Sequence, residues 1–202
     1  MPSVLPPLLA LSPGDLVEGE TRSFEQRVER ALAGGLEALV LREHALSDRA
    51  YLELGRALRA RMPVLVVHDR VHLARELRAD ALQLGYRSLP PALVGAGLLR
   101  GFSAHAHDAP GAREGADFLV LGPILRTPSK EGLLEPLGFE NLARECARET
   151  RPIWALGGLK PEHAAQVRAA GARGMVVLSG VLGAQDPERA ARSYLDAWER
   201  AR

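Results

Sequence analysis

Two glycine-containing turns near the end of the chain have the residue types of a phosphate-binding site. The apolar run 153–156 leads into Gly157–Gly158, and the run 176–178 leads into Ser179–Gly180. Glycine lets backbone amides approach a ligand closely, and a helix that begins just after the turn, as Pro161 indicates, directs its positive end toward the same anion. One such turn alone would be interpreted only as a tight turn. Two of them on neighbouring parallel strands predict a site for one phosphate group, here named the phosphate cup.

Polar side chains follow the other apolar runs in the same way. In a parallel barrel the carboxyl ends of all strands open at one mouth, where catalytic residues gather. Singly, the candidates have simpler interpretations: Arg42 and Glu43 as an exposed ion pair, and Asp69 as a helix cap. Their joint occurrence at successive strand ends favours a site for small-molecule chemistry. The candidates at these positions are Arg42, Glu43, His44, His68, Asp69, Gln83, Ser103, His105, Thr127, Ser129 and Lys130.

Lys130 is unusual for this chain. Only two of the 26 basic residues are lysines, and one of them stands beside Thr127 and Ser129 in the long segment 122–138. A compact ammonium group next to two hydroxyls is suited to a phosphate or pyrophosphate oxygen. The alternative is a solvated loop lysine. Because a loop of this length in a compact domain is usually functional, we expect it to border the site.

The elements that must position these residues alternate along the whole chain. Eight short apolar runs, each followed by a connection that is mostly helical in pattern, predict a parallel sheet with right-handed crossovers. We expect a single domain over residues 1–202, closed into a (β/α)₈ TIM barrel, with an open doubly wound sheet as the alternative. The expected strands are 8–11, 38–41, 64–67, 81–84, 98–102, 117–121, 153–156 and 176–178. The expected helices are 23–33 (opened by a capping box at 23–26), 48–61, 71–78, 108–115, 139–149, one from Pro161, and 187–199.

Composition excludes several classes of protein. The 202 residues carry a formal net charge of +1 with acids and bases interspersed, so we expect no nucleic-acid partner. No apolar run has the length of a membrane span and no secretion signal is seen, which predicts a cytoplasmic protein without a membrane partner. The single cysteine, Cys146, excludes an internal disulfide and a cysteine-rich metal site. A homo-oligomer is compatible with the sequence.

Four motifs resemble the thiamine phosphate synthase/TenI superfamily. They occur in the family's order between about Leu36 and Gly183. The resemblance implies a TIM barrel that binds a phosphorylated thiazole, with Gly157, Gly158, Ser179 and Gly180 around the phosphate. The motifs are Leu41-Arg42-Glu43, His68-Asp69-Arg70-Val71, Gly122-Pro123-Ile124 with Thr127-Pro128-Ser129-Lys130, and Ala155-Leu156-Gly157-Gly158-Leu159.

The synthase branch of this superfamily joins a hydroxymethylpyrimidine pyrophosphate to a thiazole phosphate and releases pyrophosphate with Mg²⁺. The resemblance implies that Arg42 and Lys130 face pyrophosphate and that Asp69 is a metal ligand. Two positions depart from the pattern: Ser88 stands where a second metal-binding aspartate is usual, and His44 replaces a lysine. Since Mg²⁺ prefers hard anionic oxygens, the pyrophosphate half of the site is interpreted as eroded and the phosphate cup as intact.

These departures favour the TenI branch, and we therefore predict a thiazole tautomerase that needs no cofactor. That branch's catalytic histidine position holds Pro123 here, so the proton carriers are expected to be His44 and His68, ahead of His105, with Lys130 assisting. The remaining candidates, Arg42, Glu43, Gln83, Ser103, His105, Thr127 and Ser129, are expected to contact substrate. Two alternatives stay open: a Mg²⁺-dependent thiamine phosphate synthase using Asp69, and a non-catalytic regulatory binder of thiazole or thiamine phosphates.

Overall fold

The computed structural model describes residues 5–95, 97–105, 108–109, 111–127 and 135–201. Eight parallel strands form a closed barrel in sequence order, and the pairing of β1 with β8, with Leu9 opposite Val176, completes the circle. The (β/α)₈ prediction is thus confirmed, and the open sheet is wrong. The strands are β1 Leu8–Leu11, β2 Ala38–Leu41, β3 Val64–His68, β4 Ala81–Leu84, β5 Leu99–Ala104, β6 Phe118–Leu121, β7 Ile153–Leu156 and β8 Gly174–Val177.

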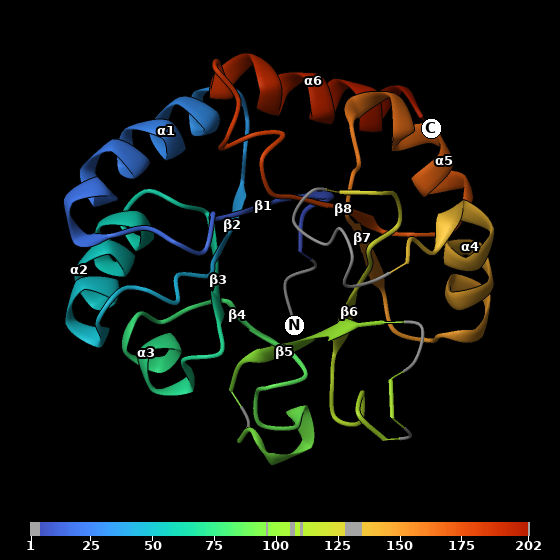
Figure 1. Cartoon of the computed structure of the whole chain (residues 1–202), viewed down its shortest axis with the longest axis horizontal. Helices are drawn as coiled ribbons and strands as arrows, with labels where there is room; N and C mark the ends of the chain where they lie inside the picture. The colour runs from blue at the N-terminus through green and yellow to red at the C-terminus, as the bar shows by residue number, and fades with distance from the viewer. Residues whose placement is uncertain (1–4, 96, 106–107, 110, 128–134, 202) are drawn as a thin grey trace.

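The helices form a ring outside the strands, and α1 lies beside α6 where the chain closes (Figure 1). None of the helices in the described residues is long and apolar enough to span a membrane. The α-helices are α1 Thr21–Ala33, α2 Asp48–Arg59, α3 Val71–Glu76, α4 Gly138–Arg148, α5 Ala164–Ala169 and α6 Pro187–Arg200. Single 3-10 turns are η1 Glu18–Glu20, η2 Pro91–Leu93 and η4 Pro161–His163.

Side chains fill the inside of the barrel. Strand residues alternate between this interior and the helix layer, so Leu9 and Val176 point inward while their neighbours pack under the helices. Trp154 is 1% exposed, meets the Phe118 ring edge-on with centroids 5.7 Å apart, and donates its Nε1–H to a backbone carbonyl at 2.9 Å. Because the interior is packed, a ligand must bind at the mouth.

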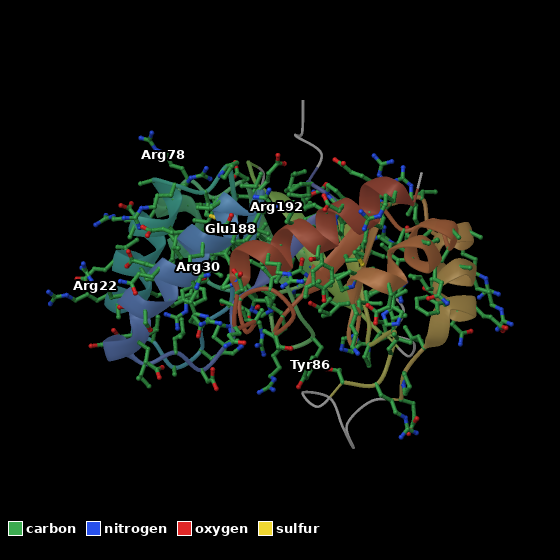
Figure 2. All side chains as sticks on the ribbon, turned by 90° about the horizontal axis from the view of Figure 1, so that it is seen from above. Arg22, Arg30, Arg78, Tyr86, Glu188 and Arg192 are labelled. Atoms are coloured by element: carbon green, nitrogen blue, oxygen red, sulfur yellow. The ribbon has the colours of Figure 1, made fainter. Side chains whose placement is uncertain are left out.

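The two ends of the barrel are easily told apart. Arg78 precedes β4 and Tyr86 follows it, and Figure 2 shows these two side chains at opposite edges of the molecule. The carboxyl ends of the strands therefore open toward the edge marked by Tyr86. We call this end the barrel mouth.

Two local predictions are wrong. Ser23 does not cap a helix, because α1 begins at Thr21, directly after η1, and the Ser23 hydroxyl donates to the carbonyl of Glu20 at 2.9 Å. The expected helix 108–115 is a series of turns in its described residues. Gly111 and Gly115 there have φ of 80° and 77°, values that a right-handed helix excludes.

Candidate active site at the barrel mouth

The strand ends bring part of the predicted set together. His44 follows β2 and His68 ends β3, and their rings meet edge-to-face with centroids 5.6 Å apart. The Nδ1 atom of His68 lies 3.1 Å from Oδ2 of Asp69, close enough for electrostatic contact but not aligned as a good hydrogen bond. The predicted convergence of these three residues at one mouth is observed.

Arg42 presents an uncompensated positive charge at this mouth. Its backbone N–H donates to the buried Ser12 hydroxyl at 2.7 Å, and its guanidinium passes Gly14 so closely that a Cβ there would lie 2.5 Å from Nη1. Among the described residues the guanidinium has no hydrogen-bond or ion-pair partner. By contrast, the nearby Arg70 is engaged by Asp48 at 2.5 Å. Arg42 is therefore the cation best placed to meet an anionic ligand.

Glu43 has a structural task and does not face the mouth as the substrate-contact prediction supposed. The residue is 1% exposed, and its two carboxylate oxygens accept the backbone N–H groups of Gly14 at 3.0 Å and Leu16 at 2.9 Å. A buried carboxylate satisfied by two amides fixes the loop between β1 and η1. That loop supports Arg42, so Glu43 acts on the site through the backbone.

Replacing this carboxylate should cost stability. Glu43→Gln leaves one acceptor oxygen and turns an NH₂ group toward an amide donor, so we expect the free energy of unfolding to fall by about 1–3 kcal/mol. Urea denaturation measures the change. Glu53→Gln is the matched control, because Glu53 lies on α2 with its side chain 65% exposed, and its effect should stay within about 0.5 kcal/mol. Equal losses in both variants would contradict the role given to Glu43.

Asp69 lies in a compact cluster with the loop after β4. Its φ is 63°, a left-handed conformation that few non-glycine residues adopt. The Ser88 hydroxyl donates to Oδ1 of Asp69 and accepts the N–H of Gly85 at 2.6 Å. Position 88 is therefore coupled to the Asp69 carboxylate, which the sequence motif alone did not show.

The electrostatics of this cluster set two pKa values. Burial acts to raise the pKa of Asp69, but the contacts with His68 and Ser88 outweigh it, so the pKa is lowered and the carboxylate is ionised. Partial burial lowers the pKa of His44, and the charges of Arg42 and His68 lower it further, although Asp69 acts in the opposite sense. The His44 imidazole is therefore neutral at pH 7.

The cluster does not match the metal site that the resemblance implies. In the described part of the chain, no three His, Cys, Asp or Glu side chains are grouped to hold a metal ion. Asp69 supplies one carboxylate whose two oxygens already face Ser88 and His68. Mg²⁺ needs several hard oxygen ligands in near-octahedral geometry. The described residues alone therefore do not fit a protein-held Mg²⁺ ion.

Two further candidates form the floor of the mouth. Gln83 is 4% exposed and donates from Nε2 to the Ser103 hydroxyl at 3.0 Å. Gly101 of β5 is paired with Gln83 of β4. A side chain at Gly101 would overlap the Gln83 amide, so the glycine leaves the space that the amide needs. Oε1 of Gln83 is buried with no hydrogen-bond partner among the described residues. This orphaned acceptor is compatible with a ligand that donates a hydrogen bond.

The remaining candidates are placed only in part. His105 follows β5, and its backbone N–H donates to Asp108 at 3.0 Å. Thr127 is half-buried in the connection after β6. Ser129 and Lys130 lie outside the described residues, so their roles stay predictions from the sequence.

The first turn of the phosphate cup requires glycine at both positions. Gly157 and Gly158 have φ of 106° and 66°. A Cβ on Gly157 would lie 2.8 Å from Cα of Pro123, and one on Gly158 would lie 2.5 Å from the carbonyl oxygen of Arg126. The N–H of Leu125 donates to the Gly157 carbonyl at 3.0 Å. The turn after β7 is thus packed against the connection after β6, with no room for a side chain.

The second turn is tied to the first by Tyr194 of α6. Its hydroxyl donates to the Leu159 carbonyl at 2.8 Å, just beyond the first turn, and a side chain on Gly180 would overlap that hydroxyl. Burial raises the pKa of Tyr194 to about 12, so the phenol remains a donor at pH 7. Sequence reasoning missed this residue, because a tyrosine on the apolar face of a helix is indistinguishable from an ordinary core residue.

Backbone donors remain available at both turns. Within the described part of the chain, no acceptor is found for the N–H groups of Gly157, Gly158 and Gly180, and all three residues are partly exposed. These groups belong to adjacent strand ends, since β7 and β8 are paired. Such amides at the carboxyl ends of neighbouring strands are a common means of holding a phosphate.

Comparison with known proteins decides the family. The sequence profile of the family described as "Thiamine monophosphate synthase" matches residues 11–181. The chain belongs to the thiamine monophosphate synthase family. It is 39% identical over 194 residues to the thiamine-phosphate synthase of Moorella thermoacetica, covering 91% of this chain and 92% of that protein. A putative thiamine-phosphate synthase of Geobacter sulfurreducens is 39% identical over 181 residues, covering 83% of this chain and 84% of that protein.

The fold comparison agrees. The solved structure of thiamine phosphate pyrophosphorylase from Pyrococcus furiosus superposes with a TM-score of 0.83, at 26% identity over 96% of each chain. The tautomerase prediction is therefore wrong: the curated relatives of this family member, at up to 39% identity, are named synthases. His44 and His68 lose their predicted task as proton carriers with it. The departures at positions 44 and 88 lie at only one part of the mouth, so they do not by themselves indicate a change of reaction.

Proposed function

We propose that this single barrel domain is a thiamine phosphate synthase. It joins hydroxymethylpyrimidine pyrophosphate to thiazole phosphate: the bond between the pyrimidine's carbon and pyrophosphate breaks, the electron pair leaves with pyrophosphate, and the thiazole takes its place. The observation that carries the proposal is the unpaired Arg42 guanidinium, at the same mouth as the glycine turns of the phosphate cup. The synthase names of the relatives support it.

Each part of the mouth has a task in this reaction. The phosphate cup holds the thiazole phosphate through its backbone amides. Arg42, with Lys130 from the sequence prediction, stabilises the negative charge that develops on pyrophosphate. The buried amide of Gln83, hydrogen-bonded to the hydroxyl of Ser103, offers its unpaired Oε1 to a polar ring atom of a substrate. His44 and His68 line the pyrophosphate side as polar neighbours.

The proposal is tested by turnover of the purified chain. With both substrates and Mg²⁺, we expect thiamine phosphate and pyrophosphate to appear in equal amounts, separated by chromatography and quantified. Omission of the thiazole phosphate is the control, and it should abolish pyrophosphate release. Tight binding of thiazole phosphate with no product at high enzyme concentration would overturn the proposal in favour of a binding protein.

Small phosphorylated substrates and biosynthetic relatives support a cytoplasmic location.

A further inference from the structure

We propose that the described residues of the free protein form no divalent-cation site at its mouth, and that Asp69 is instead held by a hydrogen bond from Ser88 and by the neighbouring His68 ring, beside a pyrophosphate site formed by the Arg42 guanidinium. The inference rests on the proposed function for the identity of the anion. It concerns the residues that distinguish this chain from the pattern with two metal-binding aspartates.

The geometry of Asp69 carries the first step. Each carboxylate oxygen faces a different group: the Ser88 hydroxyl donates to Oδ1, and Nδ1 of His68 lies 3.1 Å from Oδ2. Ser88 is fixed in turn by the N–H of Gly85 at 2.6 Å. The left-handed backbone of Asp69, with φ of 63°, sets the direction of this side chain. A metal ion that binds this carboxylate would compete with the Ser88 hydrogen bond and with the neighbouring His68 ring.

The surrounding charge carries the second step. Arg42 lies on the adjacent strand end, and its guanidinium has no counter-ion among the described residues. The serine at position 88 adds a hydroxyl where a second carboxylate would offset this charge. The unpaired Arg42 charge therefore favours a multiply charged anion such as pyrophosphate over a divalent cation at this strand end.

Mn²⁺ provides a direct probe of the first claim. Free Mn²⁺ is measured by electron paramagnetic resonance during titration of the purified full chain without substrate. Ser88→Asp adds the missing carboxylate, and because affinity rises with the charge of the ligand set, we expect its Kd for Mn²⁺ to be at least ~10-fold lower than that of the wild type. Ser88→Ala frees Asp69 without adding charge and should stay within about threefold of the wild type.

Two results of the Mn²⁺ titration would contradict the proposal. If the wild type binds one Mn²⁺ as tightly as Ser88→Asp does, and Asp69→Asn abolishes that binding, the chain holds its own metal and the proposal is wrong. Urea unfolding of each variant shows that the compared proteins are folded. A folded Ser88→Asp variant without any gain in Mn²⁺ affinity would also overturn the role given to position 88.

Inorganic pyrophosphate tests the second claim. By calorimetry in EDTA, we expect the wild type to bind pyrophosphate, and Arg42→Gln to bind it at least ~10-fold more weakly. Wild-type binding that appears only when Mg²⁺ is added would overturn the claim. Neither titration uses turnover, so absence of synthase activity would refute the proposed function and leave these results interpretable. Conversely, an active enzyme with a tight Mn²⁺ site would refute this inference alone.

Discussion

Replacing Gly158 by alanine is expected to lower kcat/KM for thiazole phosphate by about 100-fold, because several charge-assisted hydrogen bonds to the phosphate are weakened together. The new Cβ would lie 2.5 Å from the Arg126 carbonyl oxygen, and φ of 66° adds strain. The turn must move to relieve both, and its amides then no longer point at the phosphate. Steady-state kinetics with varied thiazole phosphate should show most of the loss in KM.

Gly171→Ala is the matched control for Gly158→Ala. Gly171 also has a positive φ, 93°, and a Cβ there would lie 3.2 Å from Cβ of Cys146, but it stands in the turn before β8, at the end of the barrel opposite the mouth. Both variants should lose some stability, measured by thermal unfolding, whereas only Gly158→Ala should lose affinity for thiazole phosphate. Similar kinetic losses in both would mean that general destabilisation, and not the phosphate cup, explains the effect.

The barrel fold can be predicted from the sequence because the same pattern, an apolar run followed by a connection, is repeated along the chain. Eight apolar runs recur with intervening connections, and strand pairing depends on that recurrence and not on any single run. Local signals without such redundancy failed: Ser23 has the residue types of a capping box, yet η1 precedes it and extends the helical backbone upstream. Gly111 and Gly115 override the apparent helix at 108–115 through their positive φ values.

The sequence predicts where several site residues lie, but it does not predict what each of their side chains does. Strand ends located Arg42, His68 and Asp69 correctly at one mouth, because topology fixes where a strand ends. Sequence could not show that Glu43 turns inward to hold two amides while its neighbour Arg42 remains unpaired, since that depends on the loop after β1. Nor could it find Tyr194, whose contact with the Leu159 carbonyl is made across 35 positions of the chain.

The error about the reaction has a physical origin. A hydroxyl at Ser88 and an imidazole at His44 change how negative charge is accommodated at the mouth, and from the sequence alone this change resembles loss of the pyrophosphate substrate. In the proposed synthase, however, Arg42 and the phosphate cup still provide donors for two separate anions. Changing the groups that neutralise a leaving group does not by itself change which bond breaks.

Arg42→Gln is expected to reduce kcat/KM for the pyrimidine pyrophosphate by about 100-fold or more, since it removes charge stabilisation of the leaving group. Glutamine keeps a hydrogen-bond donor of similar length but no charge. The effect should be large because the wild-type guanidinium has no counter-ion among the described residues, so its charge is available to pyrophosphate. Initial rates with each substrate varied in turn measure it, and the KM for thiazole phosphate should change by less than about threefold, because that anion binds at a separate set of donors.

Two comparison variants separate charge from shape. Arg49→Gln removes a guanidinium from α2 that is 89% exposed and paired with Glu53 at 3.1 Å, and it should leave turnover unchanged. Arg42→Lys keeps the charge but loses the planar fork, so we expect it to recover part of the activity lost in Arg42→Gln. A full rate in Arg42→Gln would show that pyrophosphate is stabilised elsewhere. An equal loss in the lysine and glutamine variants would show that Arg42 acts through its contacts with the Gly14 loop and not through its charge.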